Sequence, residues 1–246
     1  MHSRKDMNWK EMSFIGDRDV NEDSLRAIDD GETKCFIVAD GLGGHGQGDV
    51  ASSMAVNAFD SVFRGSQAPL DELMNEAFAK AQNDILARQS ETGRRFEMKT
   101  TVCALAIRGS EVIWGHIGDT RLYAFAHNRV KLRTLDHSVP QMLVLSHEIK
   151  EKEIRNHPDR NRLLRVLGVS GENPRYELSQ VQNLKKFQAF LLCSDGFWEL
   201  IMEKEMSATL RKCNSAEDWL SQMYEIVMQR GKEADMDNCS AIAIIV

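Results

Sequence analysis

The sequence predicts a layered α/β sandwich with mixed or antiparallel β-sheets. Three observations support this fold class. Short apolar runs rich in β-forming residues come first, two long segments with helical spacing follow, and strands then return for most of the remaining chain. The 246 residues suffice for a substantial hydrophobic core, and 42% hydrophobic with 28% charged residues is ordinary for a globular protein.

Three strands are predicted before the first helix, at about residues 9–15, 24–28 and 36–40. Asp29-Asp30-Gly31 lies between the second and the third strand and is a hairpin signal, because these residue types adopt tight turn conformations. The third strand ends at Asp40, and Gly41 lets the backbone turn sharply there. We therefore expect the Asp40 carboxylate at the end of a buried strand.

Two helices are predicted next, because apolar residues recur at helical spacing over residues 50–62 and again over 70–81, after a proline. Runs of β-forming residues then mark four further strands at 101–107, 112–117, 121–125 and 130–135. Gly118-Asp119-Thr120 lies between the second and third of these as a tight connection. Such a connection would hold Asp119 at the rim of a sheet.

Residues 138–175 differ in character from the rest of the chain. They are charged, contain three prolines and alternate short helical patterns with breaks, so they predict an inserted surface segment. Four arginines of this segment could steer an anionic substrate, namely Arg155, Arg160, Arg162 and Arg165. A solvated charged helix with interleaved acids accounts for the same pattern equally well.

The C-terminal part returns to the pattern of the core. A strand over residues 187–194 leads into Asp195-Gly196, which repeats the design of an apolar run that ends in Asp-Gly. A capping box that begins at Ser215 opens a third helix. Asp237-Asn238 then precedes the final strand, residues 239–246.

Composition excludes several classes of protein. The formal net charge of −6 argues against nucleic acid as the main partner, because phosphate contacts need clustered lysine and arginine. The five cysteines are scattered without a CxxC pair, which predicts buried thiols rather than disulfides or a zinc site. No apolar run resembles a signal region or reaches membrane-spanning length, so we expect a cytoplasmic protein without membrane contact.

Six acidic residues share one kind of position, because each borders an apolar run or lies in a turn that contains glycine. They are Glu22, Asp23, Asp40, Asp119, Asp195 and Asp237. If the fold brings them together, their like charges repel unless cations lie between them. Carboxylates without neighbouring histidine or cysteine favour Mg²⁺ or Mn²⁺. We therefore predict a divalent-cation site in which Asp40, next to the Gly41 carbonyl, is shared by two ions. For each acid taken alone, the backbone preferences of turns account for the residue better.

Five short motifs occur in an order that resembles the metal-dependent type 2C protein phosphatases, the PPM family. They are Arg18-Asp19-Val20-Asn21-Glu22-Asp23, Val38-Ala39-Asp40-Gly41-Leu42-Gly43-Gly44-His45, Gly118-Asp119-Thr120-Arg121, Ser194-Asp195-Gly196 and Asp237-Asn238. The bacterial branch is most similar, partly through Asp136-His137-Ser138 and Asn156-His157-Pro158. The resemblance covers the chain from about residue 13 to the C-terminus.

The resemblance implies one domain over residues 1–246 with a four-layer α-β-β-α sandwich, in which two antiparallel β-sheets lie between helical layers. It places the metals in a cleft at one end, with residues 138–175 as a flap beside it. It also implies that Asp40 bridges two core Mg²⁺ or Mn²⁺ ions and that Asp195 and Asp237 complete one of them. Asp119 would hold a third, weaker ion, shared with Asp195.

The remaining implied roles concern the second ion and the substrate. The Gly41 carbonyl would bind the second ion, and Glu22 and Asp23 would hold its waters. Arg18 matches the phosphate-binding arginine, since a guanidinium fork suits two phosphate oxygens. The implied reaction is in-line attack by a metal-bound hydroxide on phosphoserine or phosphothreonine, without a phosphoenzyme. We expect a monomer that opposes a Ser/Thr kinase.

One departure concerns the general acid. Distant eukaryotic members carry a histidine two residues after the bridging aspartate, and this chain has Leu42 there. His45 and a metal-bound water remain as candidates for protonating the leaving group.

Two alternative functions are weighed against the phosphatase. A phosphoprotein-binding module of the same fold with weak catalysis would not need the complete set of acids. An NAD-binding oxidoreductase is suggested by the GxGxxG pattern at residues 41–46, with Asp60 near the expected distance. Asp60 lies within the helical pattern, whereas a Rossmann unit needs the acid at the end of the next parallel strand.

Overall fold

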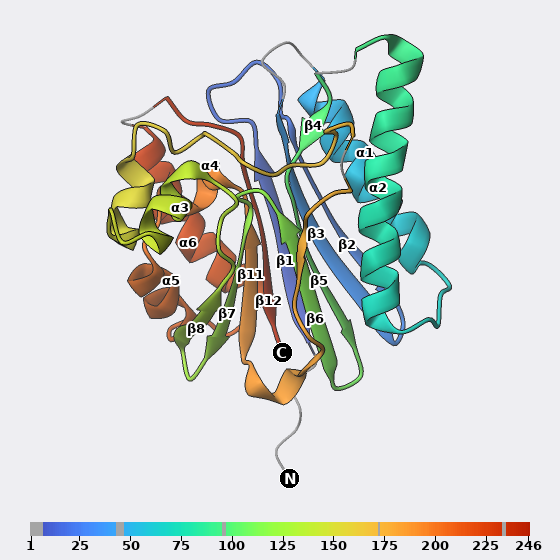
Figure 1. The fold of residues 1–246 in the computed structure, drawn as a ribbon. Helices are drawn as coiled ribbons and strands as arrows, with labels where there is room; N and C mark the ends of the chain where they lie inside the picture. The colour runs from blue at the N-terminus through green and yellow to red at the C-terminus, as the bar shows by residue number, and fades with distance from the viewer. Residues whose placement is uncertain (1–6, 43–46, 95–96, 172, 233–234) are drawn as a thin grey trace.

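The computed structural model describes residues 7–42, 47–94, 97–171, 173–232 and 235–246. Two β-sheets lie face to face, and helices cover the outer face of each (Figure 1). Every strand pairing among the described residues is antiparallel. The predicted four-layer sandwich with two antiparallel sheets is confirmed. A Rossmann unit is contradicted, because it needs parallel strands.

The first sheet has five strands in the order β1 (Asn8–Phe14), β12 (Cys239–Ile245), β11 (Ala189–Cys193), β7 (Arg121–Ala126) and β8 (Arg129–Arg133). Its outer face packs against the helices α4 (Asp195–Trp198), α5 (Glu203–Leu210) and α6 (Ala216–Gly231). Trp219 and Met223 of α6 are fully buried in this contact.

The second sheet has the order β10 (Gln182–Asn183), β6 (Glu111–Ile117), β5 (Val102–Arg108), β3 (Thr33–Leu42) and β2 (Asp23–Asp30). Two short strands extend it, since β4 (Lys99–Thr100) pairs with the end of β3 and β9 (Glu177–Leu178) pairs with β6. The helices α1 (Gly48–Phe63) and α2 (Leu70–Thr92) cover its outer face (Figure 1).

Strand β3 shows why the sequence has unbroken apolar runs. Cys35, Ile37 and Ala39 pack toward the helices, while Phe36 and Val38 pack between the sheets. A strand buried on both faces needs apolar residues at every position, not at alternate ones. By the same alternation, residue 40 follows residues 36 and 38 toward the space between the sheets.

Several predictions of secondary structure need correction. The second helix runs to Thr92, beyond residue 81, and α5 was not predicted at all. Only half of the capping box forms, because the Ser215 hydroxyl accepts from the Asp218 amide while the Asp218 carboxylate accepts from the Asn214 amide. Residues 118–120 join strands of different sheets, so this tight connection crosses the sandwich.

The inserted segment contains α3 (Val139–Leu145) and the 3₁₀ helix η1 (Glu151–Asn156), and a second 3₁₀ helix, η2 (Leu184–Lys186), precedes β11. All five cysteines are free thiols, and four of them are buried. Among the described residues, no helix combines the length and the apolar character needed to cross a bilayer.

Candidate active site

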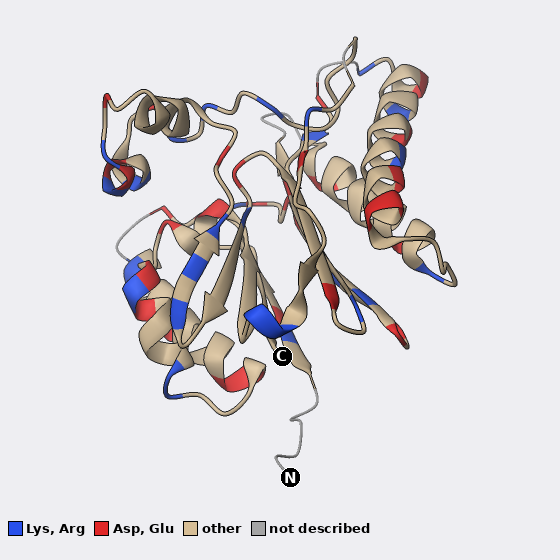
Figure 2. Cartoon of the chain, turned by 60° about the horizontal axis from the view of Figure 1, so that its bottom comes forward, with Lys and Arg blue, Asp and Glu red and all other residues tan. Residues whose placement is uncertain are grey.

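A cavity of about 1000 Å³ opens at the end of the sandwich where β3 stops. Seven of the eight predicted site residues line it, namely Arg18, Glu22, Asp40, Gly41, Asp119, Asp195 and Asp237. Further lining residues are Asp19, Val20, Leu42, Lys99, Asn161, Leu163, Val166 and Asn238. Acidic positions gather at this end of the sheets, away from the two termini (Figure 2). The fold therefore brings together acids that are far apart in the chain.

Asp40 is held at the end of β3 by the backbone and side chain of Thr101. The Asp40 amide donates to the Thr101 hydroxyl at 3.1 Å, and the Thr101 amide donates to the Asp40 carbonyl at 2.8 Å. At Gly41, a Cβ would overlap the carbonyl oxygen of Gly48. Only glycine therefore allows the first turn of α1 to come this close to the end of the strand.

The same threonine reaches the second acidic turn. Its hydroxyl contacts the Thr120 hydroxyl at 2.5 Å, next to Asp119. Gly118 has φ +98°, and a Cβ there would overlap Cγ2 of Thr101. Thr101 therefore links the ends of two strands that carry predicted ligands, a role that no local pattern in the chain indicates.

Asp195 begins α4, and its carboxylate accepts the Gly196 amide at 2.6 Å. Asp237 lines the same cavity, and its carboxylate accepts two hydrogen bonds from the Arg18 guanidinium at 2.9 and 3.0 Å. This pair is about half exposed, and the hydrogen bond to Asp237 raises the pKa of Arg18. The predicted phosphate-binding arginine thus lies in the cavity, where it now holds a predicted metal ligand.

The loop that carries Arg18 is clamped by Asn238. Its side-chain amide donates to the carbonyls of Ile15 and Val20 at 2.8 and 3.0 Å, and its oxygen accepts the Glu22 amide at 2.8 Å. Asn238 belongs to a motif noted in the sequence, but its clamping role was not predicted. Three hydrogen bonds from one side chain fix this loop over the cavity.

Glu22 and Asp23 take different positions. Glu22 lines the cavity, and burial raises the pKa of its carboxyl although a backbone hydrogen bond at Gly48 opposes this. Asp23 is only 7% exposed and does not line the cavity. One oxygen of Asp23 accepts the Ser194 hydroxyl at 2.8 Å, whereas Oδ1 is buried without a hydrogen-bond partner.

The buried carboxyl groups disfavour one another's charge. Burial, and then Asp195 and Asp237, raise the pKa of Asp23 to about 7. Burial, and then Asp237, raise the pKa of Asp195 to about 6. Burial and the neighbouring acids also raise the pKa values of Asp40 and Asp119 well above the ordinary range. Such a group of anions is stable only when protons or cations compensate its charge.

The donor set of this site fits a hard divalent cation. It consists of carboxylate and carbonyl oxygens, which suit Mg²⁺ and Mn²⁺. The unpartnered Oδ1 of Asp23 is the kind of buried acceptor that a metal-bound water would satisfy. The acids that could hold the ions directly are those on the cavity wall.

The segment 138–175 borders the cavity through Asn161, Leu163 and Val166. Arg155 does not face the cavity, because its guanidinium donates to the carbonyls of Trp198 and Ile201 and pairs with Glu203 at 2.8 Å. Two other arginines also pair with acids, Arg160 with Glu199 and Arg165 with Glu177. Arg162 is exposed. His45, a candidate general acid, lies outside the described residues.

Comparison with known proteins identifies the family of the chain. The profile of the family described as Protein phosphatase 2C matches residues 12–239. The chain belongs to the protein phosphatase 2C family. It is 33% identical over 205 residues to the serine/threonine phosphatase stp of Listeria welshimeri, a match that covers 80% of each protein. It is 28% identical over 214 residues to the serine/threonine protein phosphatase PstP of Mycobacterium tuberculosis, covering 86% of this chain and 40% of PstP.

Solved structures share the fold of this protein phosphatase 2C chain. The serine/threonine phosphatase Stp1 of Staphylococcus aureus superposes with a TM-score of 0.87 at 23% identity, covering 98% of this chain and 95% of Stp1. The catalytic domain of PstP in complex with two manganese ions has a TM-score of 0.81 at 23% identity, covering 97% of each chain. The family is metal-dependent, and its activity is that of a protein serine/threonine phosphatase.

Proposed function

We propose that this chain hydrolyses phosphoserine and phosphothreonine in proteins, with two divalent cations at the acidic end of the sandwich. The observation that supports this most directly is the common cavity of Asp40, Asp119, Asp195 and Asp237, with Arg18 at the same wall. These acids come from turns and strand ends that are far apart in the chain. Burial raises the pKa values of Asp40 and Asp119 and so disfavours their charged forms.

In this proposal, Asp40 would be shared by two core ions, and Asp195 and Asp237 would hold the first of them. The Gly41 carbonyl would hold the second ion. Asp119 and Asp195 would hold a third, weaker ion. When bound, such ions act as Lewis acids that lower the pKa of a coordinated water and polarise the phosphate.

Glu22 and Asp23 would orient waters of the second ion. Glu22 does so from the cavity wall, and Asp23 from behind it through its unpartnered oxygen. The Ser194 hydroxyl holds the other oxygen of Asp23 and so fixes the direction of this carboxylate. In this proposal, Asp23 accepts a hydrogen bond from such a water and does not contact the substrate.

Arg18 would bind the phosphate of the substrate. Its guanidinium already makes the two parallel hydrogen bonds of a fork, at present with the Asp237 carboxylate. Two phosphate oxygens present the same geometry to this fork. Because the pair is about half exposed, Arg18 can exchange one partner for the other at little desolvation cost.

The same proposal extends to the physiological ion, the domain organisation, the location and the substrates. The physiological ion is Mg²⁺ or Mn²⁺, as the oxygen donor set and the family together suggest. The chain is one phosphatase domain with residues 138–175 as a flap, and it acts as a cytoplasmic monomer. Its substrates are the phosphorylated targets of a Ser/Thr kinase, and the kinase itself.

Turnover with and without metal tests the proposal. We expect hydrolysis of p-nitrophenyl phosphate and of a phosphothreonine peptide with Mn²⁺ or Mg²⁺ and none with EDTA. Asp40→Ala should bind no shared ions and should lose turnover while it keeps the circular dichroism of the wild type. A protein that binds the phosphopeptide with Mn²⁺ but never hydrolyses it would be a binding module instead.

A further inference from the structure

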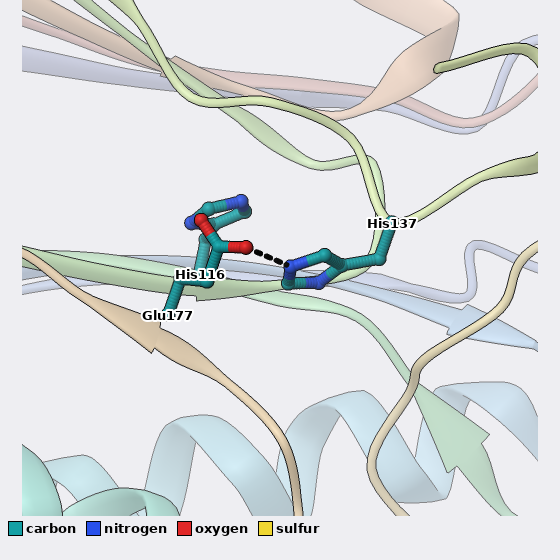
Figure 3. Close-up of side chains that lie close together, drawn as sticks. All are labelled: His116, His137 and Glu177. Carbon is teal, nitrogen blue, oxygen red and sulfur yellow. Dashed lines mark hydrogen bonds and ion pairs between the residues drawn. The ribbon is translucent and has the colours of Figure 1, made fainter. Parts of the chain in front are cut away.

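A cluster of ionisable side chains lies outside the cavity, behind the turn that carries Asp119. Side-chain nitrogen and oxygen atoms of His116, His137 and Glu177 lie within 4.8 Å of one another (Figure 3). Both histidines are buried, and Glu177 is exposed. His137 belongs to the Asp136-His137-Ser138 motif, for which the proposed function gives no role.

The stacking and the hydrogen bonding of the two histidine rings do not suit a metal ion. The two imidazole rings are stacked, with centroids 4.8 Å apart and planes 10° from parallel. The lone pairs of the ring nitrogens lie in the ring planes, which here are nearly parallel. Two histidines that bind one zinc ion must instead direct their lone pairs at a single point about 2 Å from each nitrogen. Nε2 of His116 is also occupied, since it donates to the Leu135 carbonyl at 2.7 Å.

The backbone fixes the tautomer of His137. Its Nδ1 receives the Gly118 amide at 3.1 Å, and a backbone N–H can only donate. Nδ1 therefore carries the lone pair and Nε2 the hydrogen, which is donated to Glu177 at 3.2 Å (Figure 3). Burial and the neighbouring His116 lower the pKa of His137 to about 4, so the ring stays neutral near pH 7.

The Gly118-Asp119 turn is held from both sides. On one side, His137 binds both backbone groups of Gly118, because its own amide donates to the Gly118 carbonyl at 2.9 Å. On the other side, the Trp198 indole donates to the Asp119 carbonyl at 3.0 Å. Gly118 has φ +98°, a backbone conformation that glycine adopts readily, and the hydrogen bonds on both sides fix the position of the turn.

The residue before His137 anchors this support in the core. Asp136 accepts two hydrogen bonds from Arg121 at 2.8 and 2.6 Å, and both side chains are at most 2% exposed. The guanidinium of Arg121 stacks on the Trp198 ring at 3.3 Å. The two supports of the turn, His137 and Trp198, are thus joined through one buried ion pair.

We infer that His137 is a positioning residue, which directs the Asp119 carboxylate into the cavity by accepting the Gly118 amide on Nδ1. The inference rests on the proposed role of Asp119 as a ligand of the weaker ion. The backbone of His137 also accepts the Leu164 amide at 2.8 Å and so joins the flap. A side-chain substitution leaves that backbone bond in place, which separates the two roles.

Two variants of the side chain test the acceptor. In His137→Asn, Oδ1 stands close to the position of Nδ1 and can accept the Gly118 amide, whereas His137→Leu offers no acceptor. Mn²⁺ binding to each variant is measured by calorimetry, with turnover in parallel. We expect His137→Leu to weaken the weakest Mn²⁺ site by about 10–100-fold, the usual effect of losing an outer-shell partner, and His137→Asn to stay near wild type.

Two measurements do not depend on turnover. In the metal-free wild type, the side-chain ¹⁵N spectrum should show the Nε2–H tautomer of His137, and the Gly118 amide should exchange slowly with solvent. In metal-free His137→Leu, the Gly118 amide should exchange faster. Glu177→Ala is the control, because this exposed residue contacts the opposite ring nitrogen and should leave Mn²⁺ affinity unchanged.

Several outcomes would overturn the inference. They are wild-type Mn²⁺ affinity in His137→Leu, equal weakening in the leucine and asparagine variants, an Nδ1–H tautomer, or Zn²⁺ binding that Glu177→Ala abolishes. The variant Asp119→Asn distinguishes a failure of this inference from a failure of the proposed function. If Asp119→Asn binds Mn²⁺ like the wild type, the ligand role of Asp119 is wrong, and the tautomer and Gly118 exchange still decide how the turn is held.

Discussion

Thr101 carries the prediction that tests the architecture of the site most directly. Its hydroxyl accepts the Asp40 amide and contacts the Thr120 hydroxyl, and the side chain is fully buried. Thr101→Val keeps the shape of the side chain but leaves both partners without their hydrogen bond. A buried polar group left unsatisfied costs about 1–3 kcal/mol, so two of them should lower the free energy of unfolding by about 2–6 kcal/mol.

The control is Thr101→Ser, which keeps the hydroxyl and removes the methyl group that packs against Gly118. Loss of one buried methyl group costs about 1 kcal/mol. The valine variant should therefore be the less stable of the two, although it is the more hydrophobic.

Urea unfolding of the metal-free proteins measures this difference. With a slope of about 3 kcal/mol per molar urea, a loss of about 3 kcal/mol moves the midpoint by about 1 M. Turnover with Mn²⁺ should fall in the valine variant as well, because Asp40 and the Asp119 turn lose their common support. If Thr101→Val proves as stable as Thr101→Ser, hydrogen bonding by this hydroxyl does not hold the two motifs together.

Three further predictions concern charge. Asp40→Asn should lower kcat at least about 100-fold, because the ions that Asp40 is proposed to share would stabilise transition-state charge by several kcal/mol. The same substitution should raise the metal-free urea midpoint by relieving repulsion, and a lower midpoint would contradict the repulsion. Arg155→Met should cost about 2–4 kcal/mol of stability, measured by urea unfolding, because the partners of Arg155 are Glu203 and two carbonyls. The KM for a phosphopeptide should stay unchanged, and a raised KM would support the steering role of this arginine. The folded pKa of His137 is about 4 and the unfolded value about 6.5, so its neutral form contributes stability that is lost as pH falls from about 6.5 to about 4. His137→Asn should show a shallower decline over that window than the wild type, and an equal decline would mean that other groups cause it.

Most of the fold could be predicted because the buried strands are visible in the sequence. The run that ends at Asp40 is apolar on both faces of β3, and an unbroken apolar run of this length indicates a strand covered on both sides. The missed helix α5 has polar residues at many positions and buries only part of one side, so its pattern is weak. The helix α2 was cut short for a similar reason, since buried glutamines replace apolar residues in its second half.

The cavity acids could be predicted from the sequence, whereas the residues that hydrogen-bond to their turns could not. Asp40, Asp119 and Asp195 each lie at a strand end or turn beside a glycine that makes room, and this leaves a local signal in the chain. Thr101 and Trp198 instead bind backbone atoms of distant segments, and no neighbouring residue marks them. Asn238 also binds distant backbone atoms, and the Asp237-Asn238 motif gives no sign of this clamp. Their polar groups are ordinary in any local window.

The cavity acids and the residues that support them have opposite effects on the stability of the metal-free protein. Without a cation, the acids of the cavity repel, and burial raises the pKa values of Asp40 and Asp119 instead of stabilising their charge. The hydrogen bonds that hold Asp40 and the Asp119 turn come from neutral groups, the Thr101 hydroxyl and the His137 imidazole among them, which neither add charge nor compete for a metal. A site built in this way keeps its geometry while its charge is uncompensated, so that a divalent cation meets ligands already in place and gains affinity from their repulsion. The supports should therefore matter most in the metal-free protein, where nothing else holds the carboxylates together.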